Sequence, residues 1–302
     1  MASTQAEALK TLYRSWVDRM AADPEMGLPE MRDLFEAWHQ PTAEPEEVTY
    51  AEVDAGGVPS LWCLPLGCAD DRVIVFTHGG GYVVGSRYTH RKLAGHLAKA
   101  AGCRALVIDY RLAPEFPHPA PVEDAVAAYR WLLDQGIEAG HIATCGDSAG
   151  GGLCTAMVLK ARDEGLPLPA AIMPLSPWYD MEGKGDSLDG NAAVDVLVQR
   201  EILMGMATTF LGEASAADPL ANPLYADLDG LPPVFIQVGG DETLLDDSHR
   251  FAERARDAGV DVTVEVHPEM QHVFHFLAGR APEADEAIAD LAAWVRPHLG
   301  LS

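Results

Sequence analysis

Basic residues are scarce in this sequence. Its 302 residues include 21 Lys and Arg but 46 Asp and Glu, so the formal net charge at pH 7 is −25. Such a charge repels phosphate backbones and anionic headgroups, and no local cluster of basic side chains offsets it. We therefore expect no nucleic-acid partner and attribute the acidity to a solvated acidic surface.

Long apolar runs and a recognisable secretion leader are also absent. A membrane-spanning helix needs about 18 uncharged apolar residues in succession, and no such stretch occurs. The start, MASTQAEALK, has no basic region followed by an apolar one. These absences predict a cytoplasmic protein without an integral membrane segment.

Cysteines are few and are not arranged for disulfides or metals. Their number is odd, and they lack zinc-like or CxxC spacing. No HExxH motif or other clustered ligand spacing appears either. We expect reduced, structural thiols and neither a metal nor a cofactor. The five cysteines are Cys63, Cys68, Cys103, Cys145 and Cys154.

The remaining composition is that of an ordinary globular protein, with 48% apolar and 22% charged residues. Its length suits one α/β catalytic domain with an elaboration. Apolar residues at helical spacing predict helices from Ala6 to Met20 and from Leu28 to Trp38. The alternating runs EEVTYAEVDA and VPSLWCLPL flank Gly56-Gly57, which predicts an antiparallel hairpin.

Short apolar runs alternate with helical segments after the hairpin. This pattern predicts a mostly parallel sheet of about eight strands with helices on both faces. The runs are RVIVFTH, CRALVIDY, HIATCGD, AAIMPLS, PVFIQVG and VTVEVHP. The helices are expected at roughly 88–101, 121–135, 150–164, 245–258 and 283–298.

One segment, residues 181–225, breaks this alternation. It contains EGKGDSLDG and a helical stretch, VLVQREILMGMATTFL, without a strand. Together with N-terminal residues 1–45, it is predicted to form a cap over the carboxyl ends of the strands, where open α/β sheets bind ligands. Residues 46–180 and 226–302 then form the catalytic domain.

The most specific motif is GDSAG, residues Gly146 to Gly150, which joins a strand to a helix. A serine in such a sharp turn has a strained backbone, and the glycines give it room. The helix N-terminus favours developing negative charge near the hydroxyl. We predict that Ser148 is a nucleophile rather than part of a structural turn.

A serine nucleophile needs a base and an orienting acid, each at the carboxyl end of a later strand. Asp241 directly follows the run VFIQVGG and is predicted to be the acid. Its main competitor is Glu242, because Asp246 and Asp247 lie further into the following helix. A helix cap is the structural alternative for Asp241.

The base is sought among the histidines of HPEMQHVFHF. His267 ends its strand, and His275 lies in an apolar helical run. His272 lies between them, on a loop long enough to reach Ser148, and is predicted to be the base.

Attack on an acyl carbon creates an oxyanion, which needs N–H donors already aimed at it. The N–H of Ala149, after the nucleophile, is one expected donor, and THGGGY places Gly79 and Gly80 for the same task. A rival interpretation uses Gly79, Gly81 and Gly85 with Asp109 as a dinucleotide-binding unit. The irregular glycine spacing disfavours it, and it leaves the serine, acid and histidine unexplained.

Taken together, these motifs resemble the hormone-sensitive-lipase-like, or bacterial family IV, esterases of the α/β-hydrolase superfamily. The resemblance rests on HGGGY, DYRLAPEFPHP, GDSAGG, DETLLDD and the histidine loop. It implies an α/β-hydrolase fold with a helical cap, and cofactor-free hydrolysis of short- to medium-chain carboxylic esters. It also implies the triad Ser148, Asp241 and His272, bracing of the site through Arg111 and Glu115, and a homodimer.

The histidine loop departs from the family pattern GMxHGF. Glu269 and Val273 replace its two glycines, which leaves the conformation of the loop open. The stretches 191–199 and PLYADLDGLPPVFIQVGGDE resemble sequences labelled monoterpene ε-lactone hydrolases. Lactones are therefore alternative substrates. An arylformamidase-like amidase, and a receptor similar to the gibberellin receptors, are further alternatives, although those receptors lack the histidine.

The acyl pocket is expected to be lined by apolar side chains of the cap and the strand ends, with core packing as the alternative for each. Tyr82, Trp178, Met204 and Phe210 are predicted to bind substrate. Further candidates are Trp16, Trp38 and Leu197.

Overall fold

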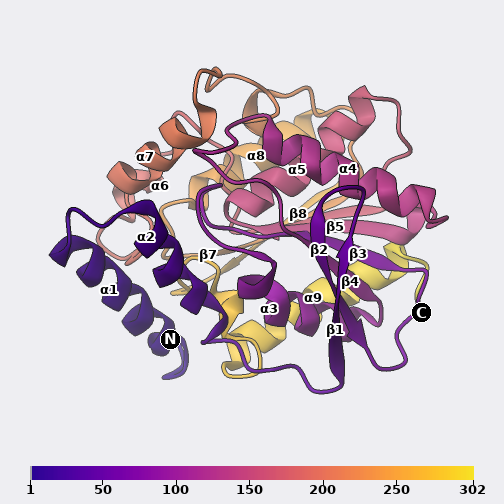
Figure 1. Ribbon diagram of the computed structural model, residues 1–302, viewed down its shortest axis with the longest axis horizontal. Coiled ribbons are helices and arrows are strands. Elements are labelled where there is room, and N and C mark those ends of the chain that lie inside the picture. Colours follow the sequence, from indigo (N-terminus) through magenta and orange to yellow (C-terminus); the bar gives the residue numbers. More distant parts are fainter. Residues whose placement is uncertain (1) are drawn as a thin grey trace.

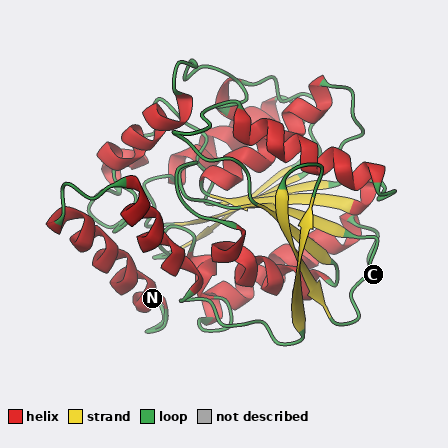
Figure 2. Ribbon diagram, viewed as in Figure 1, coloured by secondary structure: helices red, strands yellow, loops and turns green. Residues whose placement is uncertain are grey.

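The computed structural model describes residues 2–302 and contains the predicted sheet (Figures 1 and 2). Eight strands lie in the order β1-β2-β4-β3-β5-β6-β7-β8. The pairs β1–β2 and β2–β4 are antiparallel, and the other pairs are parallel. The strands are β1 (Val48–Asp54), β2 (Pro59–Pro65), β3 (Val73–Thr77), β4 (Arg104–Ile108), β5 (Ile142–Asp147), β6 (Ala171–Leu175), β7 (Val234–Gly239) and β8 (Val262–His267).

Helices cover both faces of this sheet, as the continuous apolar runs predict (Figure 1). One face packs against α4 (Ala120–Asp134), α5 (Ala149–Asp163) and α8 (Leu245–Asp257), and the other against α3 (Arg87–Ala101) and α9 (Pro282–His298). Alternate strand residues belong to different cores: Val73 and Val75 face the first, and Ile74 and Phe76 the second. The predicted α/β-hydrolase architecture is confirmed.

The hairpin between β1 and β2 is also confirmed, and its glycines are needed. Gly56 and Gly57 have φ values of 71° and 90°, a region that residues with a side chain rarely adopt. The turn sets the register that pairs Asp54 with Pro59.

Two segments lie beside the carboxyl ends of the parallel strands. The N-terminal one holds α1 (Ala6–Ala22), α2 (Leu28–Phe35) and the 3₁₀ helix η1 (Glu36–His39). The insertion, residues 181–225, holds α6 (Ser187–Gly190), α7 (Arg200–Leu211) and η3 (Pro223–Tyr225). Their grouping into one cap remains our interpretation. Two further 3₁₀ helices are η2 (Ala139–His141) and η4 (Phe274–Leu277).

Helix α7 is shorter than the sequence predicts, since it begins at Arg200 rather than at Val196. Before that start, Asp195 Oδ1 accepts hydrogen bonds from the N–H groups of Leu197 and Val198, which forms an Asx turn. Such a turn satisfies these N–H groups locally, without a continuous helix. Residues 196–199 therefore form an irregular segment, which reaches the candidate site.

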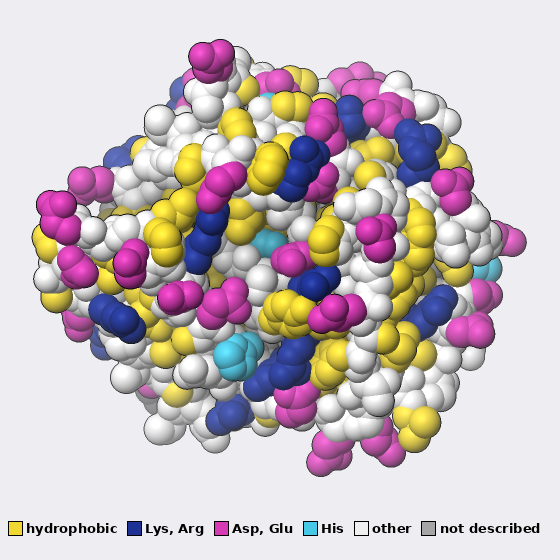
Figure 3. All heavy atoms as spheres, in the orientation of Figure 1, with side chains coloured by type: hydrophobic (Ala, Val, Ile, Leu, Met, Phe, Trp, Pro, Cys, Tyr) yellow, Lys and Arg dark blue, Asp and Glu magenta, His cyan; other side chains and the backbone are white. Residues whose placement is uncertain are grey.

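Acidic side chains do not gather in one place on the face drawn in Figure 3. On the face seen in Figure 3 they are spread over the surface of both the upper helices and the N-terminal helices. None of the helices among residues 2–302 combines the length and the apolarity that crossing a membrane requires.

Candidate active site

Ser148 occupies the sharp turn between β5 and α5, with φ 55° and ψ −122°. This backbone conformation is strained for a residue with a side chain, and the flanking glycines permit it. A Cβ added to Gly150 would lie 2.0 Å from the carbonyl oxygen of Thr77, and one added to Gly146 would lie 2.4 Å from that of Gly150. The turn predicted from GDSAG is therefore present.

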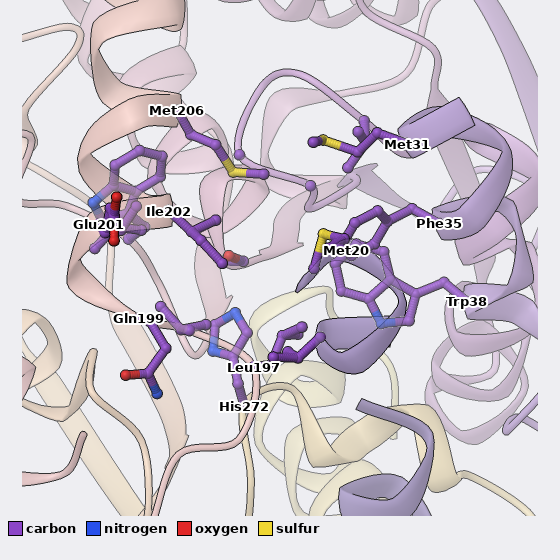
Figure 4. Close-up of a pocket in the computed structure, with 18 of the residues that line it drawn as sticks. Met20, Met31, Phe35, Trp38, Leu197, Gln199, Glu201, Ile202, Met206 and His272 are labelled. Carbon is purple, nitrogen blue, oxygen red and sulfur yellow. The ribbon is translucent and has the colours of Figure 1, made fainter. Parts of the chain in front are cut away.

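Ser148 and His272 line the same cavity, which has a volume of about 500 Å³ (Figure 4). His272 lies on the loop after β8, as expected, and its side chain is almost completely buried. The structure thus brings together the two predicted groups from chain segments more than one hundred residues apart.

The acid that contacts His272 is Glu242 rather than Asp241. Glu242 Oε2 lies 2.7 Å from His272 Nδ1, and both side chains are buried. The carboxylate of Asp241 is instead partly exposed and lies 3.5 Å from Lys10 Nζ. The structure therefore does not bring the predicted Asp241 to His272, and its main competitor Glu242 occupies that position.

The turn after β7 explains this exchange. Asp241 uses its backbone N–H to bind the carbonyl of Met270, and its side chain points to the surface. Glu242 is one residue further along, and its longer side chain returns to the sheet edge. Its Oε1 accepts hydrogen bonds from Gly239 N and Ser176 Oγ, each over 2.6 Å.

The pair of His272 and Glu242 has the electrostatics of a general base with its orienting acid. Burial disfavours the charged imidazole, but the carboxylates of Glu242, Asp195 and Asp147 outweigh it and raise the pKa of His272 above 6.5. Contact with the carboxylate places the ring proton on Nδ1, so Nε2 is free to accept a proton.

The glycine loop after β3 also differs in detail from the prediction. Gly79 donates its N–H to Asp147 Oδ1 over 3.0 Å and approaches His90 Nε2 at 3.3 Å, so it is not available to a substrate. Gly80 and Gly81 line the cavity instead. The N–H of Gly79 is thus occupied, contrary to what its predicted role requires, whereas the predicted Gly80 lies in the cavity wall together with Gly81, which was not predicted as a donor.

Gly80 is required at its position for two reasons. Its φ is 113°, and an added Cβ would lie 2.1 Å from the carbonyl oxygen of Val84. Within residues 2–302, the N–H groups of Gly80, Gly81 and Ala149 make no hydrogen bond. Ala149 begins helix α5, so its N–H belongs to the unpaired helix terminus beside Ser148.

A buried polar layer supports this loop from behind. His90 Nε2 lies 3.2 Å from the Asp147 carboxylate, and His78 stacks on Tyr110 with ring centroids 4.2 Å apart. Burial and the neighbouring His90 lower the pKa of His78 to about 3, so His78 stays neutral. The sequence indicates no role for His90, because its partner Asp147 is distant in the chain.

The cavity wall is apolar and comes from both segments beside the strand ends. In Figure 4, Met20, Phe35 and Trp38 of the N-terminal segment face Ile202 and Met206 of helix α7. The polar side chains that join Ser148 and His272 in the lining are Gln199 and Glu201.

Only part of the predicted substrate-binding set lines this cavity. Trp178 does, as do Trp38 and Leu197. Neither Tyr82 nor Phe210 does. The two side chains are buried and stack on each other, with their ring centroids 3.7 Å apart.

Met204 and Trp16 are likewise absent from the lining, because Met204 lies next to Gly183 and Trp16 packs on Phe35. Helical spacing could have identified the correct face of α7, since Ile202 and Met206 are one turn apart.

The histidine loop keeps the conformation that two glycines would favour. Glu269 and Val273 occupy the positions of the family glycines and have φ values of 63° and 50°. The loop is held from outside: Tyr13 Oη donates to the carbonyl of His272, and Gln271 binds the backbone of Val194 and Val196. Tertiary contacts therefore impose a conformation that the local sequence disfavours.

The DYRLAPE segment makes ion pairs and does not line the cavity. Arg111 binds Asp124 through two nitrogens, and Glu115 binds Arg32 of helix α2. Arg32 also donates to the carbonyl of Val83, at the end of the glycine loop turn. The bond from Glu115 through Arg32 thus reaches the glycine loop, whereas the bonds of Arg111 end on helix α4, so its bracing role stays a prediction.

No arrangement for a metal ion accompanies the site: within residues 2–302, no group of three or more His, Cys, Asp or Glu could hold one. The five cysteines are free thiols, four of them buried.

Known proteins are similar to this chain over most of its length. A family model described as the alpha/beta hydrolase fold matches residues 74–276. An acetyl-hydrolase of Streptomyces hygroscopicus is 40% identical over 297 residues, covering 92% of this chain and 98% of the relative. An esterase of Acinetobacter venetianus is 37% identical over 222 residues, covering 73% of each chain.

Solved structures also resemble this chain closely. The crystal structure of an esterase from the bacterial hormone-sensitive lipase family superposes with a TM-score of 0.95 at 45% identity, and the match covers 99% of this chain and 100% of that one. The resemblance inferred from the motifs is thereby confirmed. This chain belongs to the α/β-hydrolase fold family and, within it, to the esterases of the bacterial hormone-sensitive lipase family.

Proposed function

We propose that this ester-hydrolysing enzyme works through a Ser148–His272–Glu242 triad and a covalent acyl-enzyme. The observation that carries the proposal is the contact of 2.7 Å between Glu242 and the imidazole of His272, whose side chain shares a cavity with the strained Ser148. A histidine held by a buried carboxylate is what a serine hydroxyl requires in order to become a nucleophile.

The reaction proceeds in two steps. Ser148 Oγ attacks the ester carbonyl while His272 Nε2 takes its proton, and the resulting imidazolium gives that proton to the departing alcohol. Water then attacks the acyl-enzyme with the same base, which releases the acid and restores Ser148. Glu242 holds the Nδ1–H tautomer and stabilises the imidazolium in both steps.

The N–H groups of Gly80, Gly81 and Ala149 are the proposed oxyanion donors. Gly80 and Gly81 line the cavity, and all three N–H groups are unpaired within residues 2–302. Donors that are already oriented in a partly dry site need no reorganisation when negative charge develops on the substrate oxygen.

The properties of the cavity favour neutral esters with short to medium acyl chains as substrates. Its lining is predominantly apolar, with three methionines, Met20, Met31 and Met206, whose flexible side chains can fit different chains. Its volume of about 500 Å³ is that of a site for a small ligand. One relative is named an acetyl-hydrolase, which agrees with a short acyl group.

The test combines a variant with a substrate series. Ser148→Ala should lower the turnover of p-nitrophenyl butyrate by about 10⁶-fold while the fold is kept, as expected when a triad serine is lost. The wild type, but not the variant, should bind a serine-directed fluorophosphonate at a 1:1 ratio. Near-normal hydrolysis by the variant would overturn the triad.

Acyl chain length is tested with p-nitrophenyl esters from acetate to palmitate, beside a panel of lactones. We expect kcat/KM to be highest for short or medium chains. A clear preference for lactones would instead favour the lactone hydrolase alternative.

A further inference from the structure

Ser176 directly follows strand β6 and has an unusual backbone. Its φ is 45°, although it is not a glycine, and its side chain is completely buried. Such a conformation costs free energy and persists only where the surroundings impose it. The sequence motifs assign nothing to Ser176, and neither of the two reaction steps uses it.

The hydroxyl of Ser176 links Glu242, which follows strand β7, to the loop of His272, which follows strand β8. It donates to Glu242 Oε1 over 2.6 Å, on the oxygen that does not face His272. Ser176 Oγ itself accepts a hydrogen bond from the backbone N–H of Val273 over 3.2 Å. Val273 is the residue next to His272, so one side-chain atom contacts both the acid and the base loop.

This hydroxyl is not needed to join the strands. The backbone N–H of Ser176 already binds the carbonyl of Gln237 over 2.7 Å, which continues the pairing of β6 with β7. The hydroxyl instead completes the carboxylate shell of Glu242, whose Oε1 otherwise has Gly239 N as its donor. Hydrogen bonds to a carboxylate favour its ionised form and fix its orientation.

We propose that Ser176 is a positioning residue of the triad, which holds the Glu242 carboxylate and the His272 loop in one register through a single hydroxyl. The proposal rests on the proposed function, since it assigns to Ser176 the placement of the proposed acid and base. A glutamate has one more rotatable bond than an aspartate, so more side-chain freedom must be lost to orient its carboxylate. A hydrogen bond to the oxygen that does not contact His272 restricts that freedom.

The experiment uses two variants that both remove the hydroxyl. Ser176→Ala keeps the strained backbone, and Ser176→Gly relieves it, because glycine adopts positive φ readily. We expect kcat for p-nitrophenyl butyrate to fall by about 10- to 100-fold in both variants, with KM within about threefold, as misplacement of catalytic groups does. The melting temperatures of the two variants should differ, with Ser176→Gly the higher.

A double-mutant cycle with Glu242→Ala separates positioning from a general structural effect. If Ser176 acts through Glu242, Ser176→Ala should change kcat by less than about threefold once the carboxylate is absent. The same loss in both backgrounds, or wild-type kcat in both single variants, would overturn the proposal. Loss of turnover in Ser148→Ala and Glu242→Ala together with normal Ser176 variants would leave the proposed function intact and reject only this inference.

Discussion

Tyr13 of helix α1 donates its phenolic hydroxyl to the backbone carbonyl of His272 over 2.9 Å, and both groups are buried. The N-terminal segment therefore contacts the loop that carries His272 directly, in addition to forming one wall of the cavity. Trp38 Nε1 lies 3.4 Å from the same hydroxyl, which fixes its orientation from the other side.

Replacement of Tyr13 by Phe should affect both stability and rate. Losing a buried hydrogen bond costs about 1 kcal/mol and leaves the His272 carbonyl unpaired, so the base loop should become less well placed. We expect kcat/KM to fall by about threefold or more, since small displacements of a base are costly. Denaturant unfolding and ester hydrolysis measure the two effects.

The matched control is Thr42→Val. Thr42 Oγ1 donates to the carbonyl of Phe276 over 2.7 Å, so it also ties the N-terminal segment to the region after β8, but beyond His272. This variant should lose similar stability and keep kcat/KM within about twofold of the wild type. Wild-type kcat/KM in Tyr13→Phe would contradict a role in placing the base.

The neighbouring carboxylates Asp241 and Glu242 should give very different variants. Glu242→Gln is expected to lower kcat by about 10⁴-fold, because a neutral amide neither holds the Nδ1–H tautomer nor stabilises the imidazolium. Asp241→Asn should leave kcat within about threefold, since it removes only a partly exposed ion pair with Lys10. The reverse ranking in steady-state kinetics would restore Asp241 as the acid.

The pH dependence of kcat/KM should report His272. Its pKa is raised above 6.5 despite burial, with Glu242 as the main cause, and the reaction needs the neutral imidazole. The rate should therefore fall as the pH decreases through a value above 6.5. In Glu242→Gln the carboxylate is gone and burial remains, so the residual activity should show its acid limb at a lower pH.

A pH-stat assay avoids the titration of the p-nitrophenol product. An acid limb that stays at the same pH in Glu242→Gln would mean that another group controls the profile. The linked effect on stability has the opposite sense: a raised histidine pKa contributes stability below pH 6.5, which is lost as the pH rises through the pKa of the folded state.

Substitutions of Val273 should rank in an unusual order of stability. Its φ of 50° is unfavourable for a β-branched residue, and its side chain is buried. Both Val273→Gly and Val273→Ala lose packing, but only glycine relieves the backbone. We expect Val273→Gly to be more stable than Val273→Ala by about 1 kcal/mol, the reverse of the usual order at a site with negative φ. Chemical denaturation of the two variants measures this difference, and a more stable alanine variant would contradict the strain.

Much of the fold could be predicted because its signals are local. Alternating apolar runs and helical periodicity identified the strands and the main helices, with boundaries shifted by a few residues. Helix α7 was the exception at its start, where Asp195 binds the backbone of Leu197 and Val198. That turn depends on a side chain whose other oxygen accepts the N–H of Thr243, which no local pattern shows.

The candidate site was predictable in outline and not in detail. The strained turn at Ser148 and the loop position of His272 follow from motif and chain order, and both residues line the cavity. Which glycine presents a free N–H could not be predicted, because Gly79 is occupied by Asp147, which is 68 residues away.

By itself, the sequence determined that this chain forms a mostly parallel sheet with a serine turn, a later acid and a later histidine, because apolar periodicity and glycine placement act over short distances. Only the tertiary structure decided that Glu242 rather than Asp241 contacts His272, and that Met206 rather than Tyr82 lines the cavity. Adjacent carboxylates have the same local pattern. The direction of the turn, the length of the side chain and the contacts from distant segments select between them.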